Sequence, residues 1–305
     1  MAFVLRRNRP IRRELERLVG RQLERASADV RDEPKDEQVH DARKRIKRTR
    51  AILRLVREAA KDRRLDEADR RLQRAGRNLS PLRDAGVIAH TFDQLFRRHR
   101  DQLSEHTAAL IRRRLHELES CAESQARRAR VVARSAERLA HVRRRWRFPS
   151  LDPEDLAKLL HTAYRRARKA MRRAADTRAA SDVHRWRRRA KTLRYQVQLF
   201  ADISPKTRKR VGDLKRLDTA LGDEHNLQVL SCALDDEAAL GHLGSGVGEV
   251  QRLAASDQQQ LRSDAFALGG GLFREPPKRF VRRMRQELTA PRARGLARLF
   301  AWSAA

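Results

Sequence analysis

Two segments that begin 144 residues apart share one pattern of charged residues, and this duplication limits the possible folds more than any other feature. Residues 39–55 and 183–199 are identical at seven of their 17 paired positions. Four of these matches are Arg or Lys, and a fifth is His. A pattern that only maintained a buried helix face would match at apolar positions instead. The duplication therefore predicts two similar units that each present the same basic surface.

A second pair of segments supports this interpretation. Residues 79–87 align with residues 221–229, at an offset of 142. Between the copies, residues 147–153 contain two prolines, which are typical of a linker. We therefore expect an N-terminal half at residues 1–148 and a C-terminal half at residues 149–305. The halves should form two related helical bundles that together make one domain.

Apolar residues recur at intervals of three and four along most of the chain, which predicts an all-α fold. Proline, glycine and capping residues mark the expected helix ends. In the first half, helices are predicted at residues 11–31, 36–60 and 63–79, and a fourth begins at Ser80 and Pro81. In the second half, Asp152 is expected to cap a helix at 153–178, and further helices are predicted at 182–201 and 205–221. Gly222 is expected to end the last of these, with another helix from Asp223 and loops at 241–248 and 269–271.

Charge is the unusual part of the composition, because 72 Lys and Arg residues face only 40 Asp and Glu, a net charge of +32. Such an excess attracts polyanions, so nucleic acid, an anionic membrane and an inorganic polyanion are all possible partners. Arg far outnumbers Lys, and its planar guanidinium matches phosphate oxygens in pairs. The composition therefore favours a phosphate-rich partner.

Several functional classes lack their usual signals in this sequence. The two cysteines have neither a disulfide framework nor metal-ligand spacing. No secretory signal is evident, and no stretch approaches the roughly 18 apolar residues that span a bilayer, so we expect a cytoplasmic soluble protein. A Gly-rich phosphate loop, an HExxH motif and a repeated carboxylate set for magnesium are also missing. We therefore expect no enzyme activity, no cofactor and no metal.

Each basic segment places a line of cations beside its apolar stripe. In the first copy the apolar stripe starts at Val39, and the cations follow the same spacing one residue later, about 100° round the helix. The first stripe consists of His40, Arg43, Lys47, Arg50 and Arg54, and the second stripe of His184, Arg187, Lys191 and Arg194. At 1.5 Å per residue the first stripe extends roughly 21 Å, enough to contact several successive phosphates.

The alternative interpretation is that each stripe is an ordinary solvated helix face. Such faces usually mix charges so that opposite signs pair at i, i+4, whereas both stripes carry one sign, and no acid occurs between Asp41 and Glu58 or between Asp182 and Asp202. We therefore interpret them as anion-binding faces with the histidines as ligand contacts. Whether the two stripes form one groove or two separate patches stays open.

The helices before the stripes are predicted to contribute further cations. Residues 161–175 contain six cations and no acid, among them Arg165, Arg166 and Lys169. The corresponding first-half helix contains Arg21 and Arg25 but also three glutamates. The second half should therefore bind more strongly.

These residues resemble the CHAD family, the conserved histidine α-helical domain. The resemblance rests on residues 39–50 and 183–194, and on Arg83-Asp84 and His225-Asn226 after a helix break. It covers about residues 10–300, and it implies two four-helix bundles related by pseudo-twofold symmetry with a basic surface that binds inorganic polyphosphate. By position, the implied contacts are His40, Arg43, Lys44, Lys47, Arg50, His184, Arg187, Arg188, Lys191 and Arg194.

Two details qualify the resemblance. Asn226 stands where the family usually has aspartate, and its counterpart Asp84 is expected either to cap its helix or to orient a stripe side chain. The Glu-x-Glu-x-Lys signature of the triphosphate tunnel metalloenzyme domain, to which family members are often fused, is missing. The sequence therefore resembles the stand-alone form of the family.

Polyphosphate binding is the leading functional prediction, and attachment to polyphosphate-rich granules is compatible with it. The alternative is non-sequence-specific nucleic-acid binding, although aromatic residues, which stack on single-stranded bases, make up only 5%. An enzyme acting on polyphosphate is the third class considered. Phosphates beside His40 and His184 should raise the pKa of both histidines, so binding should tighten at mildly acidic pH.

Overall fold

The computed structural model describes residues 3–6, 9–31, 34–60, 62–122, 125–143, 148–239, 241 and 246–290. This part of the chain forms eleven helices and no strand, which confirms the predicted all-α fold. The helices are α1 (Ile11–Ala28), α2 (Asp36–Ala60), α3 (Arg63–Asn78), α4 (Pro81–Arg98), α5 (Glu105–Ala122), α6 (Gln125–Arg143), α7 (Pro153–Thr177), α8 (Ala180–Gln198), α9 (Pro205–Ala239), α10 (Val247–Leu272) and α11 (Pro277–Thr289).

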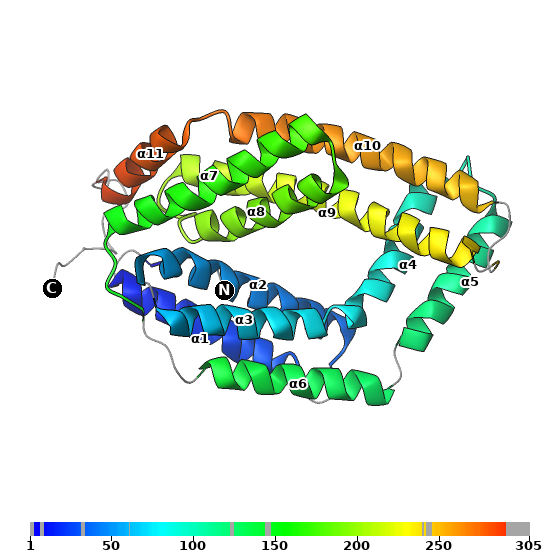
Figure 1. Ribbon diagram of the computed structural model, residues 1–305, viewed down its shortest axis with the longest axis horizontal. Helices are drawn as coiled ribbons and strands as arrows, with labels where there is room; N and C mark the ends of the chain where they lie inside the picture. Colours follow the sequence, from blue (N-terminus) through cyan, green and yellow to red (C-terminus); the bar gives the residue numbers. More distant parts are fainter. Residues whose placement is uncertain are drawn as a thin grey trace.

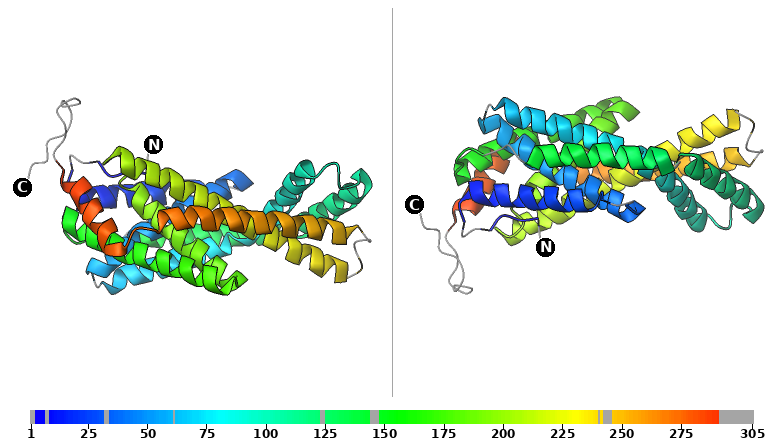
Figure 2. Two further views of the ribbon diagram at one scale, coloured as in Figure 1. Left: turned by 90° about the horizontal axis from the view of Figure 1, so that it is seen from above. Right: turned by 90° about the horizontal axis from the view of Figure 1, so that it is seen from below.

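The helices lie in two layers, and α4 and α5 lie at one end of both layers (Figure 1). One layer contains α1, α2, α3 and α6, and the other contains α7 to α11. The layers meet where α2 packs against α7 and α8. In both views of Figure 2, α4 and α5 project at one end together with the far ends of α9 and α10. The two basic helices, α2 and α8, are therefore neighbours at the centre of the molecule.

Two hydrophobic cores hold this arrangement. The larger core runs through both layers, from Phe3 to Met284, and therefore crosses the expected boundary between the halves. The smaller core joins α4 and α5 to α9 and α10 through residues such as Phe92, Leu230 and Val250, all essentially inaccessible to solvent. Burying each such side chain contributes about 1.5–3 kcal/mol.

The predicted helix end at Gly222 and the new helix at Asp223 are both wrong, because α9 continues through them to Ala239. Leu217 and Leu221 belong to the larger core, and Leu230 belongs to the smaller one. A glycine inside a helix costs only about 1 kcal/mol. Burial on both sides of Gly222 outweighs that cost, so the helix break before His225 that the sequence indicated does not exist.

The loop predicted at residues 269–271 is also wrong, since these glycines lie in the last turn of α10. Gly269 packs directly on Trp186 of α8, where a Cβ atom would lie only 2.7 Å from the indole Cζ2. The glycine therefore permits close helix packing rather than a turn. Of the other glycine segment, residues 242–245 lie outside the described residues, and α10 begins at Val247.

Two helix starts have the side-chain caps that the sequence predicted. Asp152 and Asp155 form a reciprocal capping box at the start of α7, with Pro153 in the first turn. At α9, the Ser204 hydroxyl accepts a hydrogen bond from the Thr207 amide. Ser80, by contrast, makes no capping hydrogen bond to α4. The side chain of Asp84, predicted as a cap or an orienting group, lies outside the described residues.

Candidate anion-binding site

The basic helices α2 and α8 lie side by side. The Gln196 side chain of α8 donates a 2.9 Å hydrogen bond to the Ala51 carbonyl of α2 at a buried position. The predicted core faces of both helices are buried, Val39, Ala42, Ile46 and Leu53 on α2 and Val183, Trp186, Ala190 and Leu193 on α8. Because the core faces are placed as predicted, the stripes lie beside them and turn toward the neighbouring helices.

The first stripe faces α3, which supplies its counter-charge. The Arg50 Nε lies 2.7 Å from Asp69 Oδ1, and the Arg54 Nε lies 3.2 Å from Asp69 Oδ2. Arg50 also donates to Gln73, and Arg43 donates to the Leu79 carbonyl at 2.9 Å. The stripe is therefore anchored to α3 over much of its length.

The remaining members of the first stripe differ in their exposure to solvent. His40 is exposed and Lys47 is half-buried. The exposed end of the stripe is therefore the start of α2, not the Arg50–Arg54 end.

The second stripe faces α9 in a similar way. Lys191 Nζ lies 3.2 Å from Asp218 Oδ1, and an Arg194 guanidinium nitrogen lies 2.7 Å from Asp218 Oδ2. Asp218 is buried, with 6% of its surface exposed. At the other end of the stripe, the rings of His184 and His225 lie 5.0 Å apart. A single aspartate thus holds two cations of this stripe.

These contacts correct one step of the sequence argument. Within α2 and α8 themselves, no acid follows Asp41 or Asp182 along the stripes, but folding brings Asp69 and Asp218 to them from other helices. Each aspartate meets two stripe cations, so positive charge remains in excess. The stripes are therefore partly compensated basic faces rather than fully unpaired ones.

Burial and neighbouring charge shift several pKa values in one direction. Burial is the main cause that lowers the pKa of Arg50 and of Lys191, against the opposing effects of Asp69 and Asp218. Burial, followed by the nearby Arg187 and Arg188, also lowers the pKa of His184. The pKa of His184 is thus lowered in the free protein, whereas a bound phosphate is expected to raise it. The positive charges of Arg187 and Arg188 disfavour a further positive charge on this ring.

A pocket of about 370 Å³ opens where α2 meets α7 and α8, and we call it the arginine pocket. Arg166 of α7 pairs with Glu58 of α2 across it, at 2.5 Å. The pocket is lined by Arg54, Arg57, Glu58, Asp69, Leu159, Ala163, Arg166, Arg185, Arg188, Arg189, Thr192 and Gln196. Of the predicted site residues, it brings together Arg54, Arg166 and Arg188.

Other predicted residues lie away from this pocket. Arg165 and Lys169 are exposed on α7, and Arg21 and Arg25 lie on α1, outside the pocket lining. Lys44 lies 3.8 Å from Asp41 on its own helix. The structure therefore does not gather all the predicted cations in one place.

Sequence reasoning missed the pocket residues Arg57, Arg185 and Arg189. Arg185 and Arg189 each stand one position before an apolar core residue of α8, whereas only the positions after core residues were considered. Both were present in the acid-free stretch, so the same helical-wheel argument applied to the other flank would have found them.

No described helix is long and apolar enough to cross a membrane. Within the described ranges, no three His, Cys, Asp or Glu side chains come together as metal ligands would.

Fold and site together define an all-helical protein with basic faces on two adjacent helices. The sequence profile of the CHAD domain matches residues 13–235, so the chain belongs to the CHAD domain family. The crystal structure of the CHAD domain from the plant Ricinus communis has a similar fold, with a TM-score of 0.56, 19% sequence identity and 96% of each chain covered. No curated protein sequence matches the chain significantly.

Proposed function

We propose that the protein binds inorganic polyphosphate on the basic faces of α2 and α8 and does not hydrolyse it. The observation that carries this proposal is the mutual effect of like charges across the junction of the two helices. Burial is the main cause that lowers the pKa of Arg50, and Asp69 opposes it. The positive charges of Arg54 and of Arg188 on α8 lower this pKa further. The pKa of Arg48 is lowered chiefly by burial, and the positive charge of Arg194 on α8 lowers it further. A bound polyanion relieves this repulsion.

Polyphosphate fits such a surface because it is flexible and carries about one negative charge per phosphate. Arg and Lys side chains make charge-assisted hydrogen bonds to phosphate oxygens, each worth about 1.5–3 kcal/mol. Binding also releases counterions, so affinity should fall steeply as salt rises. The family resemblance implies the same ligand. We also propose a cytoplasmic location, with which attachment to polyphosphate-rich granules is compatible.

We further propose that the two halves are related bundles with pseudo-twofold symmetry. Residues 144 positions apart play corresponding parts, since Arg50 and Arg194 each donate to a buried aspartate on the helix that follows. At the second landmark, the break between α3 and α4 corresponds to a continuous stretch of α9. A proline at position 81, where the second copy has Asp223, accounts for this difference.

Calorimetric titration of long-chain polyphosphate at about 150 mM salt tests the proposal. The test variant is Lys47→Gln, Lys191→Gln, with one lysine removed from each stripe. The control, Lys209→Gln, Lys278→Gln, removes the same charge from exposed positions on α9 and α11. We expect a loss of affinity of at least about tenfold, or 1.4 kcal/mol, in the first variant only. Equal losses would mean that net charge alone binds the polyanion.

Catalysis is tested separately by following phosphate release from polyphosphate with and without magnesium. We expect none. A binding function alone would be contradicted by phosphate release that is faster than in a protein-free control and that is lost when a single side chain of the basic faces is substituted.

Proton uptake on binding tests the role of His184. Phosphate beside the ring should raise the lowered pKa of His184, so affinity should increase from roughly pH 8 to pH 6. Calorimetry in two buffers of different ionisation enthalpy measures the uptake. A flat pH profile would remove the histidine from the proposed site.

A further inference from the structure

The arginine pocket is distinct in its chemistry from the two stripes, although Arg54 belongs to both the first stripe and the pocket. Its wall combines guanidinium groups from three helices with the apolar side chains of Leu159 and Ala163 on α7. A volume of about 370 Å³ falls at the lower end of the range typical of small-molecule sites. The pocket is therefore suited to a compact ligand rather than to an extended chain.

Two of the pocket arginines have no counter-charge. In the described part of the chain, the guanidinium groups of Arg188 and Arg189 make no hydrogen bond or ion pair, whereas Arg166 pairs with Glu58. Arg57 and Arg185 lie near carboxylates outside the lining, at 3.0 and 4.0 Å. Partial burial, followed by Arg166, Arg54, Arg188 and Arg185, lowers the pKa of Arg189. The side chains of Arg188 and Arg189 are both exposed to water, and an anion that entered the pocket would reduce the repulsion among them further.

The corresponding region of the first half is filled differently: one arginine pairs with acids, and Arg48 lies over aromatic rings, although its Nε is buried without a hydrogen-bond partner among the described residues. Positions 144 residues before Arg188, Arg189 and Thr192 are Lys44, Arg45 and Arg48. Arg45 pairs there with Asp29 at 2.5 Å and with Asp41 at 3.1 Å.

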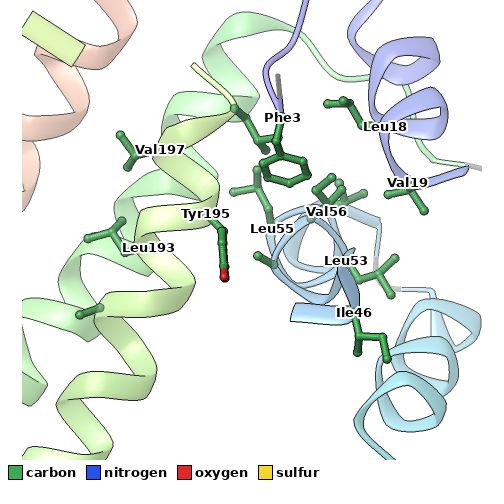
Figure 3. Close-up of a cluster of buried hydrophobic side chains, with 14 of the residues drawn as sticks. Phe3, Leu18, Val19, Ile46, Leu53, Leu55, Val56, Leu193, Tyr195 and Val197 are labelled. Atoms are coloured by element: carbon green, nitrogen blue, oxygen red, sulfur yellow. The ribbon is translucent and has the colours of Figure 1, made fainter. Parts of the chain in front are cut away.

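Phe3 fills the rest of that region. Its ring lies 5.3 Å from the Arg48 guanidinium carbon and packs edge-on against Tyr195. Figure 3 shows Phe3 inserted beside Leu55 and Tyr195, with Leu18 and Val19 on its other side. The protein fills this region with its own side chains and leaves the arginine pocket open.

The pocket also contains hydrogen-bond acceptors, which a bare polyphosphate cannot satisfy. Glu58 and Asp69 add carboxylate acceptors to the lining. A ligand that matches this wall needs phosphates for the arginines and hydroxyl donors for the acceptors. Among the described residues, no aromatic side chain lines the pocket, so none of them could stack on a nucleobase.

We propose that the arginine pocket is a second anion site, which binds a compact phosphorylated polyol bearing two or more phosphates. Arg188 and Arg189 contact the phosphates, and the Glu58 carboxylate accepts a hydrogen bond from a hydroxyl. The pocket shares Arg54, Arg166 and Arg188 with the residues predicted to contact polyphosphate, but binding of the polyol is proposed and tested independently of polyphosphate binding.

The test is calorimetry with inositol trisphosphate, compared with tripolyphosphate, which offers no hydroxyl groups. We expect one-to-one binding of inositol trisphosphate, at least about fivefold tighter than tripolyphosphate, a ratio that one added hydrogen bond can supply. The variant Arg188→Gln, Arg189→Gln should lose at least about tenfold, equivalent to 1.4 kcal/mol. Arg130→Gln, Arg134→Gln on α6 is the charge-matched control, because both side chains are exposed there.

The stripe variant Lys47→Gln, Lys191→Gln separates the two sites. Inositol trisphosphate should bind it as tightly as the wild type, while long-chain polyphosphate should not. Equal affinity for the two small ligands, or equal losses in the pocket variant and its control, would overturn the pocket proposal. Neither result would affect the loss of polyphosphate binding in the stripe variant.

Discussion

The helices α2 and α8 carry the same sequence pattern, yet their surroundings differ. On α2, the stripe is tied to α3 at Arg50 and Arg54, and the flank with Arg45 and Arg48 is closed by acids and by Phe3. On α8, the stripe is tied to α9 through Asp218, and the opposite flank opens into the arginine pocket. Equal patterns thus give unequal surfaces, because neighbouring helices decide which cations are compensated.

The largest expected effect comes from removing the aspartate of one stripe. Asp218→Ala leaves Lys191 and Arg194 without a carboxylate in a buried setting, so we expect a loss of about 4 kcal/mol in the free energy of unfolding. Asp69→Ala should cost less, because Arg54 is 31% exposed and can turn to water. Urea denaturation of both variants measures the difference. Equal losses would mean that the two stripes are held alike.

The next prediction concerns the closed flank of α2. Phe3→Ala removes a ring with 2% of its surface exposed, from between Arg48 and Tyr195. We expect a loss of about 3 kcal/mol, as for other buried phenylalanines. The midpoint and slope of urea unfolding report it. A loss below about 1 kcal/mol would show that the N-terminal segment does not fill this flank in solution, and the contrast with the open pocket would fail.

Opposite signs are expected for arginine removal on the two flanks. Arg45→Gln breaks two ion pairs and should destabilise the protein by about 2 kcal/mol. Arg188→Gln, Arg189→Gln removes uncompensated like charges and should stabilise it by about 0.5 kcal/mol. Thermal melts at low salt and at 1 M salt measure both. Destabilisation by the pocket variant would imply that the pocket arginines have structural partners.

The smallest effect is the pH dependence due to His184. Its native pKa is lowered, first by burial, so the proton binds the unfolded chain more readily. The resulting stability is complete above the unfolded pKa of about 6.5 and falls as the pH drops through the native pKa. His184→Gln should flatten this part of the stability profile by about 1 kcal/mol or less. An unchanged slope below pH 6.5 would assign the dependence to other groups.

Local signals in the sequence were sufficient for most helix positions. The start of α2 at Asp36, its end at Ala60 and the Asp152 cap of α7 follow from residues within one turn. The core faces of α2 and α8 follow from periodicity, and so does the position of the stripes beside them. These features depend on short-range chemistry that can be evaluated along a single helix.

Features that depend on contacts between distant segments could not be predicted. Asp218 reaches the second stripe from 24 residues beyond Arg194, and Glu58 meets Arg166 across 108 positions. Gly222 and Gly269 were misinterpreted because their effect depends on what packs beside them. The arginine pocket was missed for the same reason, since α2, α7 and α8 each contribute only part of its wall.

The most direct test of the central claim is competition between long-chain polyphosphate and duplex DNA at about 150 mM salt. If the basic faces of α2 and α8 form a polyphosphate site, binding should persist when DNA is present at equal phosphate concentration, and the Lys47→Gln, Lys191→Gln variant should lose that preference. If DNA displaces polyphosphate equally well from wild type and variant, the net charge of +32 accounts for the binding, and the stripes are not a specific site.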